Sequence, residues 1–193
     1  ILAPQWLAIG LQTAQNFREL KPDPDELRGR YLDEDEWLPN AIAANDMSGR
    51  NFHSVCKLLL GYHFDVDDRL EKYAREAEDL RGGGKGNTPL AQFYFYFSLS
   101  KLRLAVVNGT KNDPGIMNSV NPYLQLINIW SESAPTTFRH MYDLIMAEKA
   151  RVLGDMEGAI LHYERSIQDA HENGFINDEA LANAYDGNEA YGP

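Results

Sequence analysis

The chain has 193 residues, 44% of them hydrophobic, and it carries a formal net charge of -11 at pH 7. This length is enough for a domain with its own hydrophobic core, and a mean hydropathy of -0.46 is typical of a soluble chain. The acidic balance argues against nucleic acid as a partner, because a phosphate backbone must be met by a basic surface. No apolar run approaches the roughly 20 residues that a membrane-spanning helix needs, so we expect no membrane partner.

The single cysteine, Cys56, excludes an intramolecular disulfide and indicates a reducing compartment, so we expect a cytoplasmic protein. Because Cys56 lies in an apolar segment with Val55 and Leu58, we expect a buried core residue rather than a nucleophile. The chain opens on Ile1 with neither a methionine nor a signal-like segment, and we expect it to be a piece of a longer protein.

Apolar residues at helical spacing predict a first helix over residues 5–20, which should stop before the prolines that follow. Residues 21–33 are predicted to be a polar connection. A second helix is predicted to open on the acidic run at 33–36, and residues 48–51 should break the pattern. The apolar faces of these two helices are expected to consist of Leu7, Leu11, Ala14 and Phe17, and of Trp37, Leu38, Ala41 and Ile42.

Two more helices are predicted over about 52–63 and directly after the aspartates at 65–68, which we expect to cap the second one. The glycine-rich run at 81–87 is predicted to be the most flexible stretch of the chain. Beyond it, turn residues at both ends and the length of the apolar run favour a helix from Pro89 to Val107.

Residues 116–132 carry another helical pattern, and residues 136–173 are predicted to form the best helical hairpin of the chain. Gly154 should supply its turn in the left-handed conformation, and Asp155 should cap the second helix. A last helix is predicted from near Asn177, ending at 186–188 and leaving 185–193 as a tail.

The first helices of successive hairpins are predicted to start near residues 52, 89, 137 and 175. Helical-hairpin repeats are roughly 34 to 47 residues long, and the spacing here is uneven, with a long loop around 108–118. The pattern therefore predicts an all-α fold, an irregular solenoid of antiparallel helical hairpins that forms one domain over residues 1–193.

The sequence does not match the motifs of phosphate-binding, metal-binding or catalytic sites. Residues 81–88 lack the order of glycine, lysine and hydroxyl residue that a phosphate loop needs. The aspartates at 65–68 lack the glycine that a calcium loop has at its sixth position, where Leu70 stands. The five histidines show no zinc spacing, and no nucleophile, base and oxyanion donors can be assembled. We expect no catalytic activity, no metal and no cofactor.

The 136–173 hairpin resembles a tetratricopeptide repeat, and residues 35–184 resemble the helical-repeat region of large signalling proteins. In those proteins a kinase-like segment and an AAA-type (STAND-like) ATPase precede the repeats, and GAF and histidine-kinase modules follow. The resemblance implies a regulatory module linked to two-component signalling, without the kinase or ATPase motifs. The stretches that carry it are LLLGYHFDVDDRLEKYAREAEDL, FYFYFSLSKLRLA, WSESAPTTFRH and LIMAEKARVLGDMEGAILHYERSIQDAHENGFINDEALAN.

Stacked hairpins form a concave surface that binds peptides or neighbouring domains, and we expect a protein or another domain of the same chain as partner. The alternative is a small-molecule sensor with a pocket lined by the aromatic residues 93–97, Tyr62, Tyr73 and Trp130, although such aromatics are also typical of a core. For the interaction module, the predicted groove residues are Met141, Leu144, Glu148 and Arg151.

Overall fold

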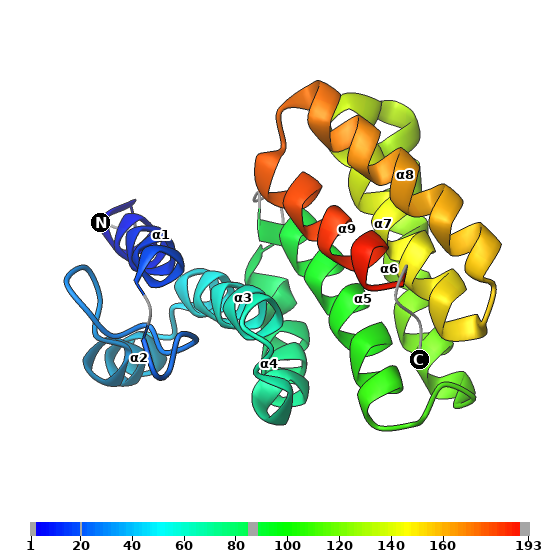
Figure 1. Ribbon diagram of the computed structural model, residues 1–193. Coiled ribbons are helices and arrows are strands. Elements are labelled where there is room, and N and C mark those ends of the chain that lie inside the picture. Colours follow the sequence, from blue (N-terminus) through cyan, green and yellow to red (C-terminus); the bar gives the residue numbers. More distant parts are fainter. Residues whose placement is uncertain (1–2, 20, 85–88, 190–193) are drawn as a thin grey trace. The chain divides into compact units, whose positions relative to one another are not determined.

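The computed structural model describes residues 3–19, 21–84 and 89–189, and within them the regular structure is helical apart from one isolated bridge between Arg28 and Asp33 (Figure 1). The predicted all-α class is confirmed. The chain divides into two compact units, residues 1–100 and 101–193. The solenoid and the single repeat domain stay predictions. Among the described helices, none combines the length and the apolar character that a membrane crossing requires.

The N-terminal unit is arranged around α3, which contacts α1, α2, α4 and the short 3-10 helix η1. Its core includes Ile9, Leu27, Leu32, Leu60 and Cys56. Cys56 is buried, so the predicted core position of this cysteine is confirmed, and burial raises the pKa of its thiol to about 12. The helices are α1 (Ala3–Arg18), α2 (Glu34–Ala43), α3 (Met47–His63), α4 (Asp67–Leu80), η1 (Arg81–Gly84) and α5 (Pro89–Val107), which continues into the second unit.

Two predicted helix boundaries are wrong. Helix α3 begins at Met47, so residues 48–51 belong to it and do not break the pattern. The Asp46 carboxylate accepts a hydrogen bond from the Gly49 N–H at 2.9 Å, and this cap offsets the low helix propensity of glycine. The N-cap of α4 is Val66, which makes no side-chain cap bond. Of the aspartates that were expected to cap α4, Asp67 and Asp68 lie in its first turn, where the helix dipole favours them, and Asp65 precedes the N-cap.

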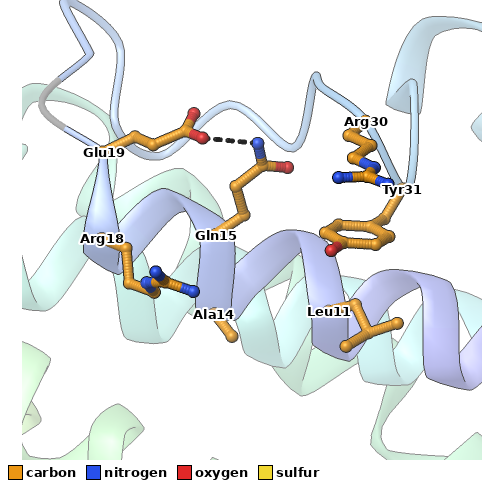
Figure 2. A pocket seen from close by; sticks show the side chains of 7 residues that line it. All are labelled: Leu11, Ala14, Gln15, Arg18, Glu19, Arg30 and Tyr31. Atoms are coloured by element: carbon orange, nitrogen blue, oxygen red, sulfur yellow. Dashed lines mark hydrogen bonds between the residues drawn. The ribbon is translucent and has the colours of Figure 1, made fainter.

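The inner face of α1 carries polar side chains beside the core residue Ile9, and the predicted apolar stripe faces outward. Gln12 and Asn16 are fully buried, whereas Leu7, Leu11 and Phe17 are exposed. Figure 2 shows Leu11 and Ala14 on the side of α1 below the loop residue Tyr31. The reason is that buried side-chain amides on α1 satisfy backbone groups of the 21–33 loop, which apolar side chains cannot do.

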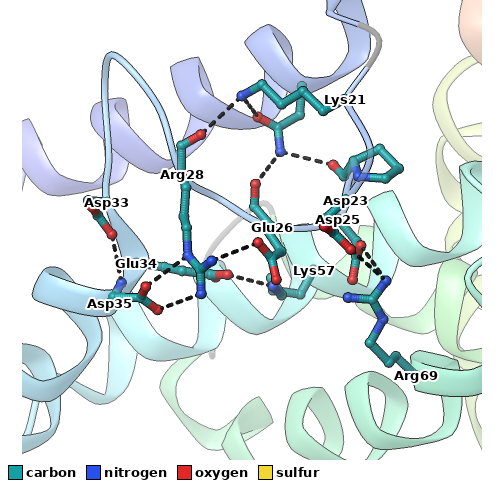
Figure 3. A network of polar contacts seen from close by, with 12 residues as sticks. Lys21, Asp23, Asp25, Glu26, Arg28, Asp33, Glu34, Asp35, Lys57 and Arg69 are labelled. Carbon is teal, nitrogen blue, oxygen red and sulfur yellow. Dashed lines mark hydrogen bonds and ion pairs between the residues drawn. The ribbon is translucent and has the colours of Figure 1, made fainter.

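A buried carboxylate joins α2 to α3 (Figure 3). Glu34, in the first turn of α2, has one oxygen 2.8 Å from His53 Nε2 and accepts at the other a hydrogen bond from Lys57 Nζ at 2.7 Å. His53 and Lys57 are four residues apart and therefore share one face of α3. Burial by itself raises the pKa of Glu34, but these two partners outweigh burial and lower the pKa to about 2.

The polar contacts continue from α3 to α4 and to the loop. Lys57 Nζ lies 5.2 Å from the centre of the Tyr73 ring on α4. The Tyr73 hydroxyl donates to Asp25 Oδ2 at 2.5 Å, and Arg69 Nη2 lies 3.2 Å from the other oxygen of Asp25. We call these six residues the Glu34 network: Asp25, Glu34, His53, Lys57, Arg69 and Tyr73. This network joins α2, α3, α4 and the 21–33 loop, because buried polar groups need hydrogen-bond or ion-pair partners.

The C-terminal unit contains α6 (Pro114–Ser133), α7 (Pro135–Leu153), α8 (Met156–Asn173) and α9 (Ile176–Glu189) besides the end of α5. Helix α7 contacts α6, α8 and α9, and α8 also contacts α9. The predicted hairpin is confirmed: Gly154 has a φ of 82°, and the Asp155 carboxylate accepts a hydrogen bond from the Gly158 N–H. The predicted end of the last helix at 186–188 is wrong, because α9 continues to Glu189.

Replacing the Glu34 carboxylate should reduce stability in a pH-dependent way. We expect Glu34→Gln to lower the free energy of unfolding by about 2 to 3 kcal/mol at pH 6, because Lys57 and His53 lose a buried charge partner. A lowered native pKa contributes stability above the unfolded value near 4.5 and loses it as the pH falls through about 2. At pH 3 the difference between variant and wild type should therefore shrink by about 1 to 2 kcal/mol, allowing for solvent screening.

Urea unfolding at pH 6 and at pH 3 measures both quantities. The control is Glu36→Gln, which makes the same chemical change at an exposed position two residues later in α2. It should change the stability little at either pH. A difference between Glu34→Gln and wild type that is the same at both pH values would contradict the assigned role of Glu34.

Candidate functional site

The structure places most of the predicted groove residues inside the C-terminal unit. Met141, Leu144 and Glu148 are buried on α7, and Arg151 is half-buried. Helical spacing identifies one stripe of α7, and in the structure this stripe packs inward. As partner contacts the four residues stay predictions, and they offer a partner little surface.

Glu148 is the buried carboxylate of this unit. The Arg151 guanidinium lies 2.6 Å from one of its oxygens, and the Tyr163 hydroxyl of α8 donates a hydrogen bond to the other. Burial, together with the negative charge of Glu148, raises the pKa of Tyr163, so that its phenol stays protonated and remains a donor. The three side chains hold α7 to α8 and satisfy one another.

A groove on the same unit lies between α6 and α7, and we call it the α6–α7 groove. Its volume is about 630 Å³. On α6 its polar wall consists of side chains spaced by four and three residues, and on α7 the lining residues have the same spacing, so each set forms a column along one helix face. The lining residues are Asn121, Leu124, Gln125, Asn128 and Ile129 of α6 and Tyr142, Met146 and Lys149 of α7.

The groove combines carboxamides, one cation and apolar contacts. Lys149 Nζ donates to Asn121 Oδ1 at 3.0 Å across the groove, and Asn128 donates to Glu132 at 3.1 Å. None of the eight described lining residues is acidic, although the whole chain carries a net charge of -11. Each carboxamide offers both a donor and an acceptor, which is the pair of groups that a peptide backbone also presents.

The groove corresponds to a pattern of Asn and Gln residues in the sequence, which lies beside the more obvious apolar pattern. On α6 the pattern drew attention to the buried residues Tyr123 and Ile127, and the amide column lies on the neighbouring face. Met146 of α7 also lines the groove. A column of Asn and Gln at helical spacing beside an apolar stripe therefore indicates a polar groove wall.

The aromatic residues proposed for a sensor pocket pack against one another. Phe93, Phe95 and Phe97 of α5 are fully buried, and Tyr62 meets Tyr96 edge-on at 5.8 Å between ring centres. Neither of the two cavities described here is lined by them. The part of the chain that the structure describes contains no group of three or more His, Cys, Asp or Glu arranged to hold a metal ion.

Comparisons with models of known protein families, with curated proteins and with solved structures found no match to this chain. The resemblance to tetratricopeptide repeats of signalling proteins therefore stays a prediction from the sequence.

Removing the Tyr163 hydroxyl should destabilise the C-terminal unit. We expect Tyr163→Phe to lower the free energy of unfolding by about 1 to 3 kcal/mol, because the buried Glu148 carboxylate loses a donor. Tyr142→Phe makes the same change in the half-buried α6–α7 groove and should cost less than about 0.5 kcal/mol. Urea denaturation compares the two, and equal losses of stability would show that burial of the Glu148–Tyr163 pair does not matter.

Proposed function

We propose that this chain is a non-catalytic interaction module of a larger signalling protein and that it binds an extended peptide segment in the α6–α7 groove. The segment comes from a partner protein or from a neighbouring domain of the same chain. The observation that carries the proposal is the carboxamide column of α6 facing the Tyr142, Met146 and Lys149 column of α7 across a groove of about 630 Å³.

Carboxamides suit the main chain of a peptide. An extended peptide presents alternating N–H and C=O groups, and a side-chain amide can donate to one and accept from another at the same time. The polar residues Asn121, Gln125 and Asn128 repeat along α6 at intervals of four and three residues, about 5 to 6 Å apart. This interval is close to the roughly 6.5 Å over which an extended peptide repeats the groups on one side, so successive amides can meet every second peptide unit and affinity comes from the backbone of the ligand.

The remaining lining residues favour a particular kind of side chain. Lys149 supplies a positive charge in a groove without acidic lining residues, which favours an acidic side chain or a terminal carboxylate in the peptide. Met146 and the exposed Ile129 offer adaptable apolar contacts beside it. We therefore propose a peptide that carries an acidic group next to an apolar residue.

The arrangement of the helices supports an interaction module. Helix α7 contacts both its hairpin partner α8 and α9, the first helix after that hairpin, as stacked helical repeats do. The resemblance to the repeat region of kinase-like, ATPase and histidine-kinase signalling proteins fits the same role. The proposal includes no reaction, since the buried ionisable groups of both units are used to join helices.

A random peptide display library tests this function. Selection on the wild-type protein should enrich peptides with an acidic residue, and fluorescence anisotropy then measures their affinity. We expect Lys149→Gln and Gln125→Ala each to weaken binding by about tenfold, which corresponds to about 1.4 kcal/mol for one lost charged or amide contact.

Matched controls make the same changes at exposed positions outside the groove. Lys111→Gln lies in the loop before α6, and Gln168→Ala lies on the exposed face of α8. Both should bind the selected peptides as wild type does. Failure to enrich any peptide, or selected peptides that bind Lys149→Gln and Gln125→Ala as tightly as wild type, would overturn the proposal.

A further inference from the structure

A second cavity lies in the N-terminal unit, between α1 and the end of the 21–33 loop (Figure 2). Its volume is about 310 Å³, which lies at the lower end of the range found for small-molecule sites. We call it the loop pocket. Its walls combine apolar side chains, one carboxamide and three charged groups, and the lining residues are Leu11, Ala14, Gln15, Arg18, Glu19, Arg30 and Tyr31.

The loop that forms one wall of the pocket is held by buried side chains of α1. Gln12 Oε1 accepts hydrogen bonds from the backbone N–H groups of Tyr31 and Leu32, at 3.0 and 3.3 Å. Gln12 is itself fully buried and donates to Asn16, which in turn donates to the carbonyl oxygens of Pro24 and Glu26. These hydrogen bonds preorganise the wall of the pocket, and preorganisation lowers the entropic cost of binding a ligand.

Two guanidinium groups, those of Arg18 and Arg30, line this pocket. Among the described residues, neither Arg18 nor Arg30 forms an ion pair or a hydrogen bond, whereas Arg28, two residues before Arg30, pairs with Glu26 and Asp35. Arg30 is placed over the ring of Tyr31, 5.7 Å from the ring centre. In an acidic chain, two unpaired arginines at one cavity form a local site for an anion.

The acidic group of the pocket is already engaged. Glu19 accepts a hydrogen bond from Gln15 Nε2 at 2.6 Å and lies 3.5 Å from Lys21 Nζ. The hydrogen bond from Gln15 and the nearby Lys21 lower the pKa of Glu19, which therefore stays ionised and bound to these partners. Lys21 lies closest to Glu19, and the charge of Arg18 makes a smaller contribution to the same carboxylate, so positive charge of the two arginines remains for a ligand.

The apolar part of the pocket comes from the outward stripe of α1. Leu11 and Tyr31 expose 39% and 42% of their surfaces, and Ala14 between them is also exposed. Exposed apolar surface beside the two arginines is suited to a ligand with both an apolar body and an anionic end.

We propose that the loop pocket binds a small organic anion. Its carboxylate or phosphate group lies between Arg18 and Arg30, and its apolar body packs against Leu11 and Tyr31. This site is separate in residues and in ligand from the α6–α7 groove and goes beyond the interaction function proposed above. It gives the N-terminal unit a ligand of its own, held by charge-assisted hydrogen bonds from two guanidinium groups.

Isothermal titration calorimetry at low ionic strength tests the proposal with benzoate, phenyl phosphate, acetate and inorganic phosphate as probes. We expect the two aromatic anions to bind at least tenfold more tightly than acetate and inorganic phosphate, because only they have an apolar body. The tighter of benzoate and phenyl phosphate identifies the anionic group that the site prefers. Arg18→Gln and Arg30→Gln should each weaken binding of that probe by about tenfold.

The control is Arg75→Gln, which removes an exposed arginine of α4 that does not line the pocket and should leave the affinity unchanged. Arg18 and Arg30 are themselves exposed, so their variants should keep the wild-type melting temperature. Three results would overturn the proposal: no binding of either aromatic anion, equal binding of benzoate and acetate, or equal losses of affinity in Arg75→Gln and Arg30→Gln.

Discussion

Each unit contains a buried glutamate, and the need to neutralise its carboxylate constrains how the helices around it pack. Glu34 takes a lysine and a histidine from one face of α3, while Glu148 takes an arginine from its own helix and a phenol from α8. An ionised carboxylate without such partners is unstable away from water, so a helix arrangement that separated them would be strongly disfavoured. Apolar burial supplies the driving force for both units, and these carboxylates select the partners.

A second constraint comes from the 21–33 loop. Its backbone groups need hydrogen-bond partners where the loop lies against α1, and Gln12 and Asn16 provide them. This use of the inner face leaves the apolar stripe of α1 that contains Leu11 on the outside, beside Arg18 and Arg30. The loop pocket is therefore a consequence of how the loop is held, and its exposed apolar wall has a structural cause.

The two cavities share an electrostatic character that differs from that of the whole chain. The net charge is -11, yet the α6–α7 groove presents Lys149 without an acidic lining residue, and the loop pocket presents two arginines without ion-pair partners among the described residues. Locally positive sites attract anionic groups, and the negative charge on the rest of the protein repels these groups from other parts of the surface. A peptide with an acidic group and a small organic anion are the two ligands that fit this distribution.

The sequence by itself determined the helical class, the extent of α5, the Gly154–Asp155 turn and the buried state of Cys56. These features depend on local properties: backbone preferences, caps, and the spacing of apolar side chains. Only the tertiary structure decided which face of each helix is buried. The stripe of α1 with Leu11 faces outward and the stripe of α7 with Leu144 faces inward, although both have helical spacing. Periodicity identifies a face, but burial depends on the charges and backbone groups that distant segments bring to it, and a single helix does not contain that information.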